Sequence, residues 1–284
     1  MKKIAILGPK NTYSEVAAKA YLKNQFESYD IIYQKSVVGV FQAIKEGTIG
    51  IVPIENTLEG YVQQHLDYIL DYPTFSIVAE LKLNVSFACI SHCKLEAVKK
   101  IYVQYATKNQ CSKFIALLED KQIVISDSNT QSYQLYLEDD SSAVIIPKHL
   151  YQKGMANIEI EDVTDELHNE TRFFVIEHNN NIIKHKQDYK MAIVFTPKMD
   201  KPGLLLSIIE SFAKASINLI SIMSRPTKKA IGTYHFFIEL ECIETRITEI
   251  QNILSGLSSD IQVRLLGVFP DFSVEIDEIN FTMI

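Results

Sequence analysis

The start of the chain shows a pattern that later segments repeat: residues 3–23 read KIAILGPKNTYSEVAAKAYLK. The short apolar run at 3–7 is typical of a buried strand. Residues 13–23 place Val16 and Ala20 on one face, which predicts an amphipathic helix. A strand followed directly by a helix is the repeating unit of an α/β domain with a largely parallel sheet.

The same alternation continues through the first two thirds of the chain. Strands are expected at 31–34, 49–54, 75–78, 85–90, 101–105, 123–126, 142–146 and 173–176, and helices at 37–45, 62–70, 111–119 and 130–137. The pattern restarts after residue 78, which indicates two α/β lobes, with the chain returning to the first lobe near Arg172. Folds of this kind bind ligands in the cleft between the lobes.

A polar connector, His178-Asn179-Asn180-Asn181 and onward to about residue 190, separates a second unit. Its apolar pattern predicts strands at 191–195, 218–223, 234–241 and 261–269, with helices at 204–214 and 244–254. This βαββαβ order is the ferredoxin-like layout. We therefore expect a two-lobed domain over 1–180, a second domain over 189–270 and a tail over 271–284 with no assigned structure.

Composition restricts the class of function. Hydrophobic residues make up 47% of the chain and charged residues 22%, which is typical of a globular protein. A net charge of −7 argues against nucleic-acid binding, and no apolar stretch approaches the roughly 20 residues of a membrane span. No signal peptide is visible, and four irregularly spaced cysteines fit a reducing cytoplasm.

The run Cys89-Ile90-Ser91-His92-Cys93 raises the possibility of a metal site. It offers at most three ligands and has no second cluster, so buried or strand-edge thiols are the better interpretation. We expect no metal. The histidines nearest the polar segments, His65 and His168, are expected in surface or capping roles.

Three polar segments follow or begin predicted strands. The first, GPKNTYSE at 8–15, leads into the first helix, where Thr12 and Ser14 beside the helix N-terminus suit a carboxylate ligand. Plain helix capping is the alternative. Asn11 lies at the turn, and asparagine tolerates a positive φ better than most residues.

The second segment, VPIENTLEG at 52–60, places Glu55, Asn56, Thr57 and Glu59 in a loop at the end of a strand, where a binding loop or a solvated helix cap would fit. The third, NETRFFVI at 169–176, places a hydroxyl and a guanidinium at the entry to an apolar strand. Adjacent residues of a strand point to opposite faces, so Thr171 and Arg172 converge only if the backbone there is irregular.

Together the three segments resemble the signature segments of prephenate dehydratase: a Gly-Pro-x-Gly-Thr-Phe/Tyr-Ser loop, an Ile-Glu-Asn-Ser-x-Glu-Gly loop and an Asn-x-Thr-Arg-Phe segment. Asn11 replaces the glycine of the first, and Thr57 replaces the serine of the second. A fourth stretch of the family, before Gln110-Cys111, is poorly matched. The resemblance implies a two-lobed, periplasmic-binding-protein-like catalytic domain that binds prephenate between its lobes.

The resemblance also assigns roles to residues. Thr171 matches the threonine that is essential in the family, and we expect it to donate a hydrogen bond to the leaving hydroxyl. Expected substrate-binding residues are Thr12, Ser14, Asn56, Thr57, Arg172 and Phe173, and expected loop-supporting residues are Asn11, Glu55, Glu59, Gly60 and Asn169. The two glutamates would repel a dianionic substrate, so they are expected to orient donors or brace loops. The reaction requires no cofactor.

The second domain resembles an ACT domain, which implies phenylalanine as an effector held between paired domains of a homodimer or homotetramer. The matching residues are Gly203 and Leu204 in one motif, Asn218 and Leu219 after the helix, and Ser224 and Arg225 in the other motif. Met223 stands where the second motif has a glutamate, which removes one charge. A dimerisation module without a ligand is the alternative.

Three functions remain open at this point. Prephenate dehydratase, forming phenylpyruvate on the route to phenylalanine, is the leading one. Arogenate dehydratase runs the same elimination on an amino-bearing substrate, and one or two contacts would separate the two. A non-catalytic amino-acid-sensing protein belongs to a different class, and the presence of Thr171 and Arg172 argues against it.

Overall fold

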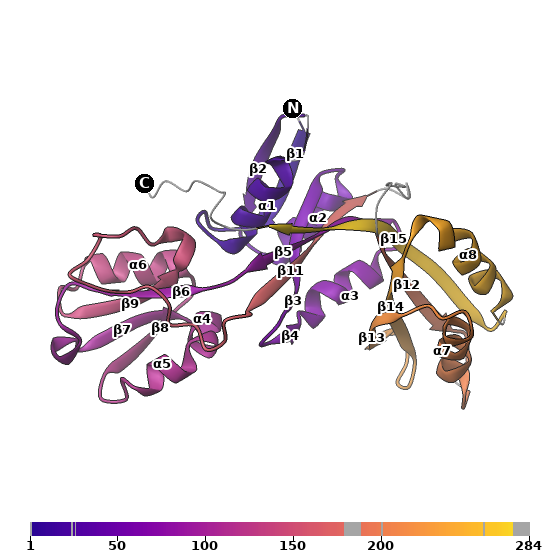
Figure 1. Cartoon of the computed structure of the whole chain (residues 1–284). Coiled ribbons are helices and arrows are strands. Elements are labelled where there is room, and N and C mark those ends of the chain that lie inside the picture. The colour runs from indigo at the N-terminus through magenta and orange to yellow at the C-terminus, as the bar shows by residue number, and fades with distance from the viewer. Residues whose placement is uncertain are drawn as a thin grey trace.

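The computed structural model describes residues 2–23, 25, 27–178, 189–199, 201–257 and 259–274. Two lobes and a C-terminal domain lie in a row, with the first lobe in the middle (Figure 1). Within these residues, no helix combines the length and apolar character that crossing a membrane requires.

The first lobe is built on a sheet in the order β5-β11-β3-β1-β2. Its strands are β1 (Lys2–Leu7), β2 (Tyr29–Gln34), β3 (Ile49–Asn56), β4 (Gly60–Tyr61), β5 (Phe75–Asn84) and β11 (Glu170–His178), and its helices are α1 (Tyr13–Lys23), α2 (Val37–Lys45) and α3 (Gln63–Asp71). Helix α1 packs on one face, while α2 and α3 pack on the other. Strand β1 runs parallel to β2 and β3, whereas β11 is antiparallel to β3 and β5.

The second lobe has its own sheet, in the order β10-β6-β9-β7-β8. Its elements are β6 (Phe87–Ser91), η1 (Leu95–Ala97), β7 (Lys100–Gln104), α4 (Tyr105–Gln110), α5 (Ser112–Ala116), β8 (Gln122–Ser126), α6 (Asn129–Leu137), β9 (Ser142–Pro147), η2 (Lys148–Leu150) and β10 (Ile158–Ile160). The chain enters this lobe from β5 and returns through β11, so the predicted two-lobed α/β fold and its return near Arg172 are confirmed.

The C-terminal domain has the predicted βαββαβ order. It comprises β12 (Tyr189–Pro197), α7 (Leu204–Lys214), β13 (Leu219–Pro226), β14 (Tyr234–Cys242), η3 (Glu244–Arg246), α8 (Ile247–Gly256) and β15 (Ile261–Val274). The strand order β13-β14-β12-β15 confirms the ferredoxin-like layout. Both helices cover one face of this sheet, and Val194, Phe237 and Phe269 on the other face pack into the core of the first lobe.

Strand β15 joins the two parts into one sheet. Residues 261–270 pair with β12, and residues 271–274 continue as a strand parallel to β5. A Cβ atom at Gly267 would lie 2.1 Å from the carbonyl oxygen of Ile77, so glycine permits this close approach. Residues 271–274, which the sequence analysis left without an assigned structure, therefore belong to this strand. Residues 275–284 lie outside the described part of the chain.

Candidate active site

The second and third polar segments are neighbours in the structure. Strand β11 is antiparallel to β3, and Thr171 at its beginning pairs with Asn56 at the end of β3. Because β1 and β3 are parallel, the first polar segment leaves the sheet at the same edge. Strand pairing therefore brings all three segments to the edge of the sheet where the chain passes to the second lobe.

Asn56 makes hydrogen bonds to both the second and the third polar segment. Its Oδ1 accepts hydrogen bonds from the backbone N–H groups of Leu58 (2.9 Å) and Glu59 (3.2 Å), which fixes the orientation of the amide. Its Nδ2 therefore faces Asn169 Oδ1 (2.8 Å) and Thr171 Oγ1 (3.0 Å). Since the Thr171 oxygen accepts from this amide, its own O–H hydrogen remains available for donation.

A directed chain of amides continues from Asn56. Asn169 Nδ2 donates to Gln110 Oε1 at 2.8 Å, and Gln110 Nε2 donates to Glu59 Oε1 at 3.1 Å. The Glu59 carboxylate can only accept when ionised, so it sets the direction of every bond in the chain. The three amide side chains are buried, where unmade hydrogen bonds are costly, so the chain holds Asn56 in place.

Gln110 is a member that the sequence analysis missed. It lies on α4 of the second lobe, whereas Asn56 and Glu59 belong to the first lobe. The pair Gln110-Cys111 was visible in the sequence, but its poorly matched surroundings gave no reason to assign it a role. The amide chain thus ties the two lobes together at the position of Thr171.

Thr57 braces the loop. Its hydroxyl donates to the carbonyl oxygen of Glu170 (3.1 Å) and accepts from the N–H of the same residue (3.0 Å). Gly60, with φ 75°, turns the chain back into β4. In this geometry Thr57 links the loop to β11, and its expected contact with substrate stays a prediction.

The first segment forms a tight helix entry. Asn11 adopts φ 65°, as the sequence analysis expected of a residue that replaces glycine. Its N–H donates to Glu15 Oε2 at 2.6 Å, and the carbonyl oxygen of Thr12 begins the helical bonding. Burial alone raises the pKa of the Glu15 carboxyl, but Lys19 and the Asn11 N–H outweigh burial and lower the pKa. Glu15 therefore stays ionised and closes the turn.

This segment lies against the second lobe. Thr130 Oγ1 at the start of α6 donates to the carbonyl oxygen of Lys10 at 3.2 Å. The Tyr13 hydroxyl donates to the carbonyl oxygen of Ser86 (2.6 Å), in the connection between β5 and β6. Ser14 is buried, and Thr12 Oγ1 lies 3.3 Å from the carbonyl oxygen of Pro9. The α1 N-terminus is thus positioned at the junction of the lobes.

The side chains of Arg172 and Phe173, which follow Thr171, lie apart from the amide cluster around Asn56. The Arg172 guanidinium points to the opposite side of β11, into a cluster with Glu55, Glu80 and Glu239. Phe173 is 1% exposed and packs in the core beneath α1. In this structure three carboxylates bind Arg172 and a closed core surrounds Phe173, and their expected contact with substrate stays a prediction.

His65 also differs from expectation. It is buried, and its Nδ1 lies 2.6 Å from the carbonyl oxygen of Pro53, at the start of the second segment. A carbonyl can only accept, so Nδ1 carries the hydrogen. Burial lowers the pKa of His65, which makes it a neutral brace for the loop.

Comparisons with known proteins agree with this arrangement. Residues 4–181 match the family model of prephenate dehydratase. A prephenate dehydratase of Methanocaldococcus jannaschii is 34% identical over 265 residues, which cover 93% of this chain and 96% of that protein. The chain belongs to the prephenate dehydratase family.

Solved structures give the same result. The prephenate dehydratase of Staphylococcus aureus superposes with a TM-score of 0.78 at 28% identity, covering 95% of this chain and all of that one. A prephenate dehydratase of Arthrobacter aurescens in complex with L-Phe has a TM-score of 0.78 at 26% identity, covering 94% of this chain and 89% of the other.

The expected effector residues of this family member divide between the two ends of the C-terminal sheet. Ser224 pairs with Phe236, which also pairs with Phe195 near the end of β12, so Ser224 and Arg225 share an end with the Gly203-Leu204 turn. Leu219, following Asn218, lies at the other end, opposite Leu240. Arg225 itself is bound to Asp67 and Gln63 of α3 in the first lobe.

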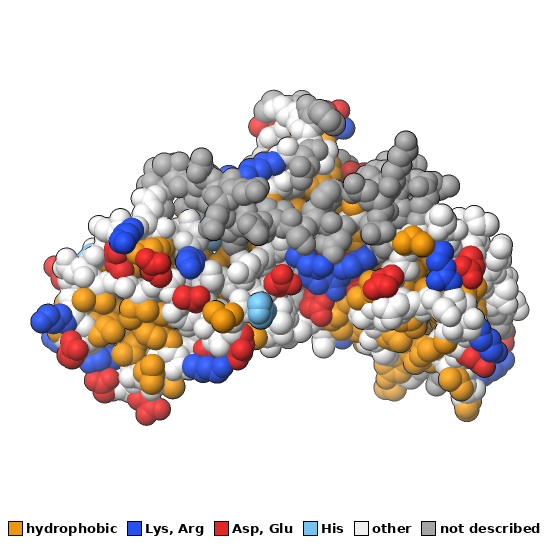
Figure 2. Space-filling view, viewed as in Figure 1, with side chains coloured by type: hydrophobic (Ala, Val, Ile, Leu, Met, Phe, Trp, Pro, Cys, Tyr) orange, Lys and Arg blue, Asp and Glu red, His pale blue; other side chains and the backbone are white. Residues whose placement is uncertain are grey.

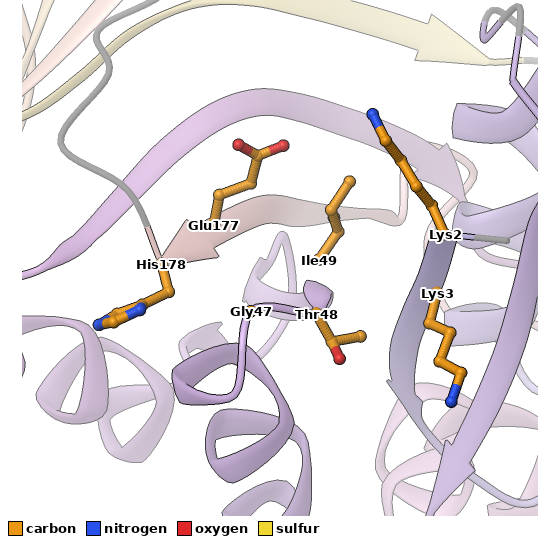
Figure 3. A pocket seen from close by; sticks show the side chains of 7 residues that line it. All are labelled: Lys2, Lys3, Gly47, Thr48, Ile49, Glu177 and His178. Atoms are coloured by element: carbon orange, nitrogen blue, oxygen red, sulfur yellow. The ribbon is translucent and has the colours of Figure 1, made fainter.

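One of the pockets in the described residues lies in the first lobe, away from the candidate site. It encloses about 370 Å³ between Lys2, Lys3, Gly47–Ile49, Glu177 and His178 (Figure 3). These residues lie at the end of β11 that is remote from Thr171. No group of three metal-binding side chains occurs among the described residues of this prephenate dehydratase family member.

Proposed function

We propose that this chain converts prephenate to phenylpyruvate with loss of water and carbon dioxide, as a carbon–oxygen lyase in phenylalanine biosynthesis. The observation that carries the proposal is the Thr171 hydroxyl, which accepts from the fixed Asn56 amide at the junction of the two lobes. Its free O–H hydrogen is the donor that departure of a ring hydroxyl needs.

The chemistry makes modest demands on the protein. Loss of carbon dioxide and hydroxide gives an aromatic ring, so the substrate supplies the driving force. A threonine hydroxyl is a weak acid and acts as a positioned hydrogen-bond donor, an effect worth on the order of 10² to 10⁴ in rate. No cofactor enters the scheme.

The substrate carboxylates require donors that are not already committed. The N-terminus of α1 offers first-turn N–H groups and partial positive charge beside Thr12 and Ser14. We assign carboxylate binding to this segment. Asn56 contributes by orienting Thr171, and Glu55, Glu59, Thr57, Asn169 and Gly60 support the loops.

The C-terminal domain is assigned as an ACT domain that binds phenylalanine between two copies. Its β13 is an edge strand that exposes Ile220 (37%) and Ile222 (43%), and Leu206 on α7 is 66% exposed. Figure 2 shows hydrophobic side chains gathered on the lower edge of this domain, over α7 and the β13–β14 hairpin. Pairing of two domains would cover such a surface and give at least a dimer.

A cytoplasmic location is proposed on the cysteines. Cys89, Cys93, Cys111 and Cys242 are all free, and burial raises the pKa of the Cys89 thiol to about 12. Buried, unpaired thiols of this kind are typical of a reducing compartment.

The deciding experiment is incubation with prephenate at neutral pH, with phenylpyruvate followed by its ultraviolet absorbance. Thr171→Ala is expected to lower kcat by two to four orders of magnitude, and Thr171→Ser to retain most of the activity. Circular dichroism checks that both variants fold. Unchanged turnover by Thr171→Ala would refute the assigned role, and no turnover by the wild type would refute the function.

A further inference from the structure

A buried cluster of charges joins the C-terminal domain to the back of the candidate site. Arg172 Nη2 lies 2.6 Å from Glu239 Oε1 of β14 and 2.7 Å from Glu80 Oε2 of β5, while Nη1 lies 2.5 Å from Glu55 Oε2 of β3. The side chains of Glu80 and Glu239 are fully buried, and that of Arg172 is 13% exposed. Lys190 adds a second cation, 2.6 Å from Glu80.

Tyr61 closes the cluster. Its hydroxyl lies 2.6 Å from Glu239 Oε2 and 2.8 Å from Ser221 Oγ of β13, and Arg172 Nη1 is 3.4 Å away. Glu239 therefore uses one oxygen for Arg172 and the other for Tyr61. Burial alone lowers the pKa of Arg172, but the carboxylates of Glu239 and Glu80 outweigh it and raise the pKa. The guanidinium is thus permanently charged and firmly held.

The charged residues are direct neighbours, along the same strands, of the residues in the candidate site. Thr171 is followed by Arg172, Asn56 is preceded by Glu55, and the loop that contains Glu59 ends at Tyr61. Glu55 pairs with Tyr61 in the β3–β4 ladder, and Arg172 pairs with Glu55 in the β3–β11 ladder. Adjacent strand residues project to opposite faces, so one face carries the amide chain and the other carries the charges.

We propose that Glu239 of the C-terminal domain is a positioning residue, which acts through Arg172 and Tyr61 to hold β11 and the Asn56 loop where Thr171 is productive. This inference rests on the proposed function of Thr171. The domain thereby sets the catalytic geometry from behind the sheet without contacting the substrate. Displacement of a reacting group by about 1 Å costs on the order of 10²-fold in rate, so small movements of this cluster matter.

The test compares two substitutions at the same domain interface in the full chain. Glu239→Gln keeps the size of the side chain but removes one of the three carboxylate charges that hold Arg172, the one that the C-terminal domain supplies. The matched control is Asp67→Asn. Asp67 makes a largely buried ion pair with Arg225 at the same interface (15% and 14% exposed), but it lies on α3, and no hydrogen bond or ion pair joins it to β11 within the described residues. We expect Glu239→Gln to lower kcat about 10- to 100-fold with KM within about twofold. Asp67→Asn should leave kcat within about twofold.

A second readout does not depend on turnover. Hydrogen exchange of peptides covering 169–174 should accelerate in Glu239→Gln and stay unchanged in Asp67→Asn. If the wild type forms no phenylpyruvate, the proposed function fails, and this exchange measurement still decides whether Glu239 positions β11.

Two results would overturn the inference: equal kcat losses in both variants, which would indicate general loosening of the interface, or unchanged kcat and exchange in Glu239→Gln. If Glu239→Gln fails to fold, Tyr61→Phe removes the other contact to the same carboxylate. Tyr61→Phe should also lower kcat, and an unchanged kcat in this variant would count against the proposed role of Glu239.

Discussion

The Nδ2 atom of Asn56 lies 3.0 Å from the Oγ1 atom of Thr171, and this contact joins the two polar segments. Its direction matters more than its length. Because two backbone N–H groups bind Asn56 Oδ1, the amide presents its NH₂ group to the threonine. The hydroxyl oxygen accepts this bond, and its hydrogen can be directed at a substrate.

Asn56→Asp should therefore inactivate the protein while changing its shape little. An aspartate places an acceptor where the donor was, takes up the Thr171 hydrogen and adds a negative charge beside a dianionic substrate. We expect kcat to fall on the order of 10²- to 10³-fold, measured by phenylpyruvate formation. Asn252→Asp, the same change on the exposed face of α8, is the control and should leave kcat unchanged. A kcat within threefold of wild type for Asn56→Asp would contradict the assigned donor direction.

Gln110→Ala tests whether the second lobe completes the site. The change leaves the buried Asn169 Nδ2 without its acceptor, which costs about 1–3 kcal/mol, and it removes the donor to the exposed Glu59 carboxylate. We expect kcat/KM for prephenate to fall about 10- to 100-fold. Gln104→Ala is matched in type and removes only the cap of α4, where Gln104 Oε1 accepts from Thr107 N. Equal effects of the two substitutions would show that α4 stability, rather than the amide chain, is responsible.

Phe173 and Leu117 offer opposite tests of burial. Phe173→Ala removes a fully buried ring and should lower the free energy of unfolding by about 3–5 kcal/mol, measured by urea denaturation. Leu117→Ala, at a residue that is 80% exposed, should change it by less than about 0.5 kcal/mol. Phe173→Leu should keep the KM for prephenate within about twofold. A large rise in KM for this variant would restore Phe173 as a substrate contact.

His149 should give the stability a distinct pH dependence. Burial lowers the pKa of His149 from 6.5 to about 4, and the ring packs edge-on against Tyr13. A histidine with a lowered folded-state pKa stays neutral in the fold but takes up a proton on unfolding. The contribution of neutral His149 to the free energy of unfolding is therefore fully present above pH 6.5. It falls by up to about 3 kcal/mol as the pH is lowered towards 4. Unfolding curves of wild type and His149→Gln should converge over this window, and a constant difference would contradict the prediction.

Ile222→Glu tests the expected pairing of C-terminal domains. A charge on the exposed face of the edge strand β13 should dissociate the oligomer, as measured by light scattering, because an unpaired charge is costly at a closed apolar contact. Phenylalanine binding, measured by calorimetry, should weaken in parallel while the monomer keeps its fold. Retained binding by a monomeric variant would place the effector site within a single chain.

Local sequence pattern predicted much of the fold. Helices α1, α2 and α7 begin and end where the periodicity places them, because each carries a continuous apolar face that the sheet buries. Helix α4 was missed because its short, polar sequence has no such face. Strand β5 extends to Asn84 through the buried Glu80, whose partners Arg172 and Lys190 are 92 and 110 residues away, so no local pattern reveals this extension.

The candidate site was predictable in its segments but less so in its side-chain directions. Thr171 and Asn56 lie together as three neighbouring signature segments imply. The orientation of Arg172 depends on Glu80 and Glu239, which are 92 and 67 residues away, so its partners appear only when the sheet is assembled. The hydrogen-bond partner of Gln110, Asn169, is likewise 59 residues away, so no local pattern indicates a role for Gln110.

Strand β15 has a consequence for any attempt to separate catalysis from regulation. Its backbone is hydrogen-bonded first to β12 and then to β5, so a continuous strand joins the sheet of the C-terminal domain to the sheet of the first lobe (Figure 1). Truncating the chain before Tyr189 would remove this partner from β5 and expose unpaired backbone N–H and C=O groups along β5. Such a fragment should aggregate rather than behave as a deregulated enzyme.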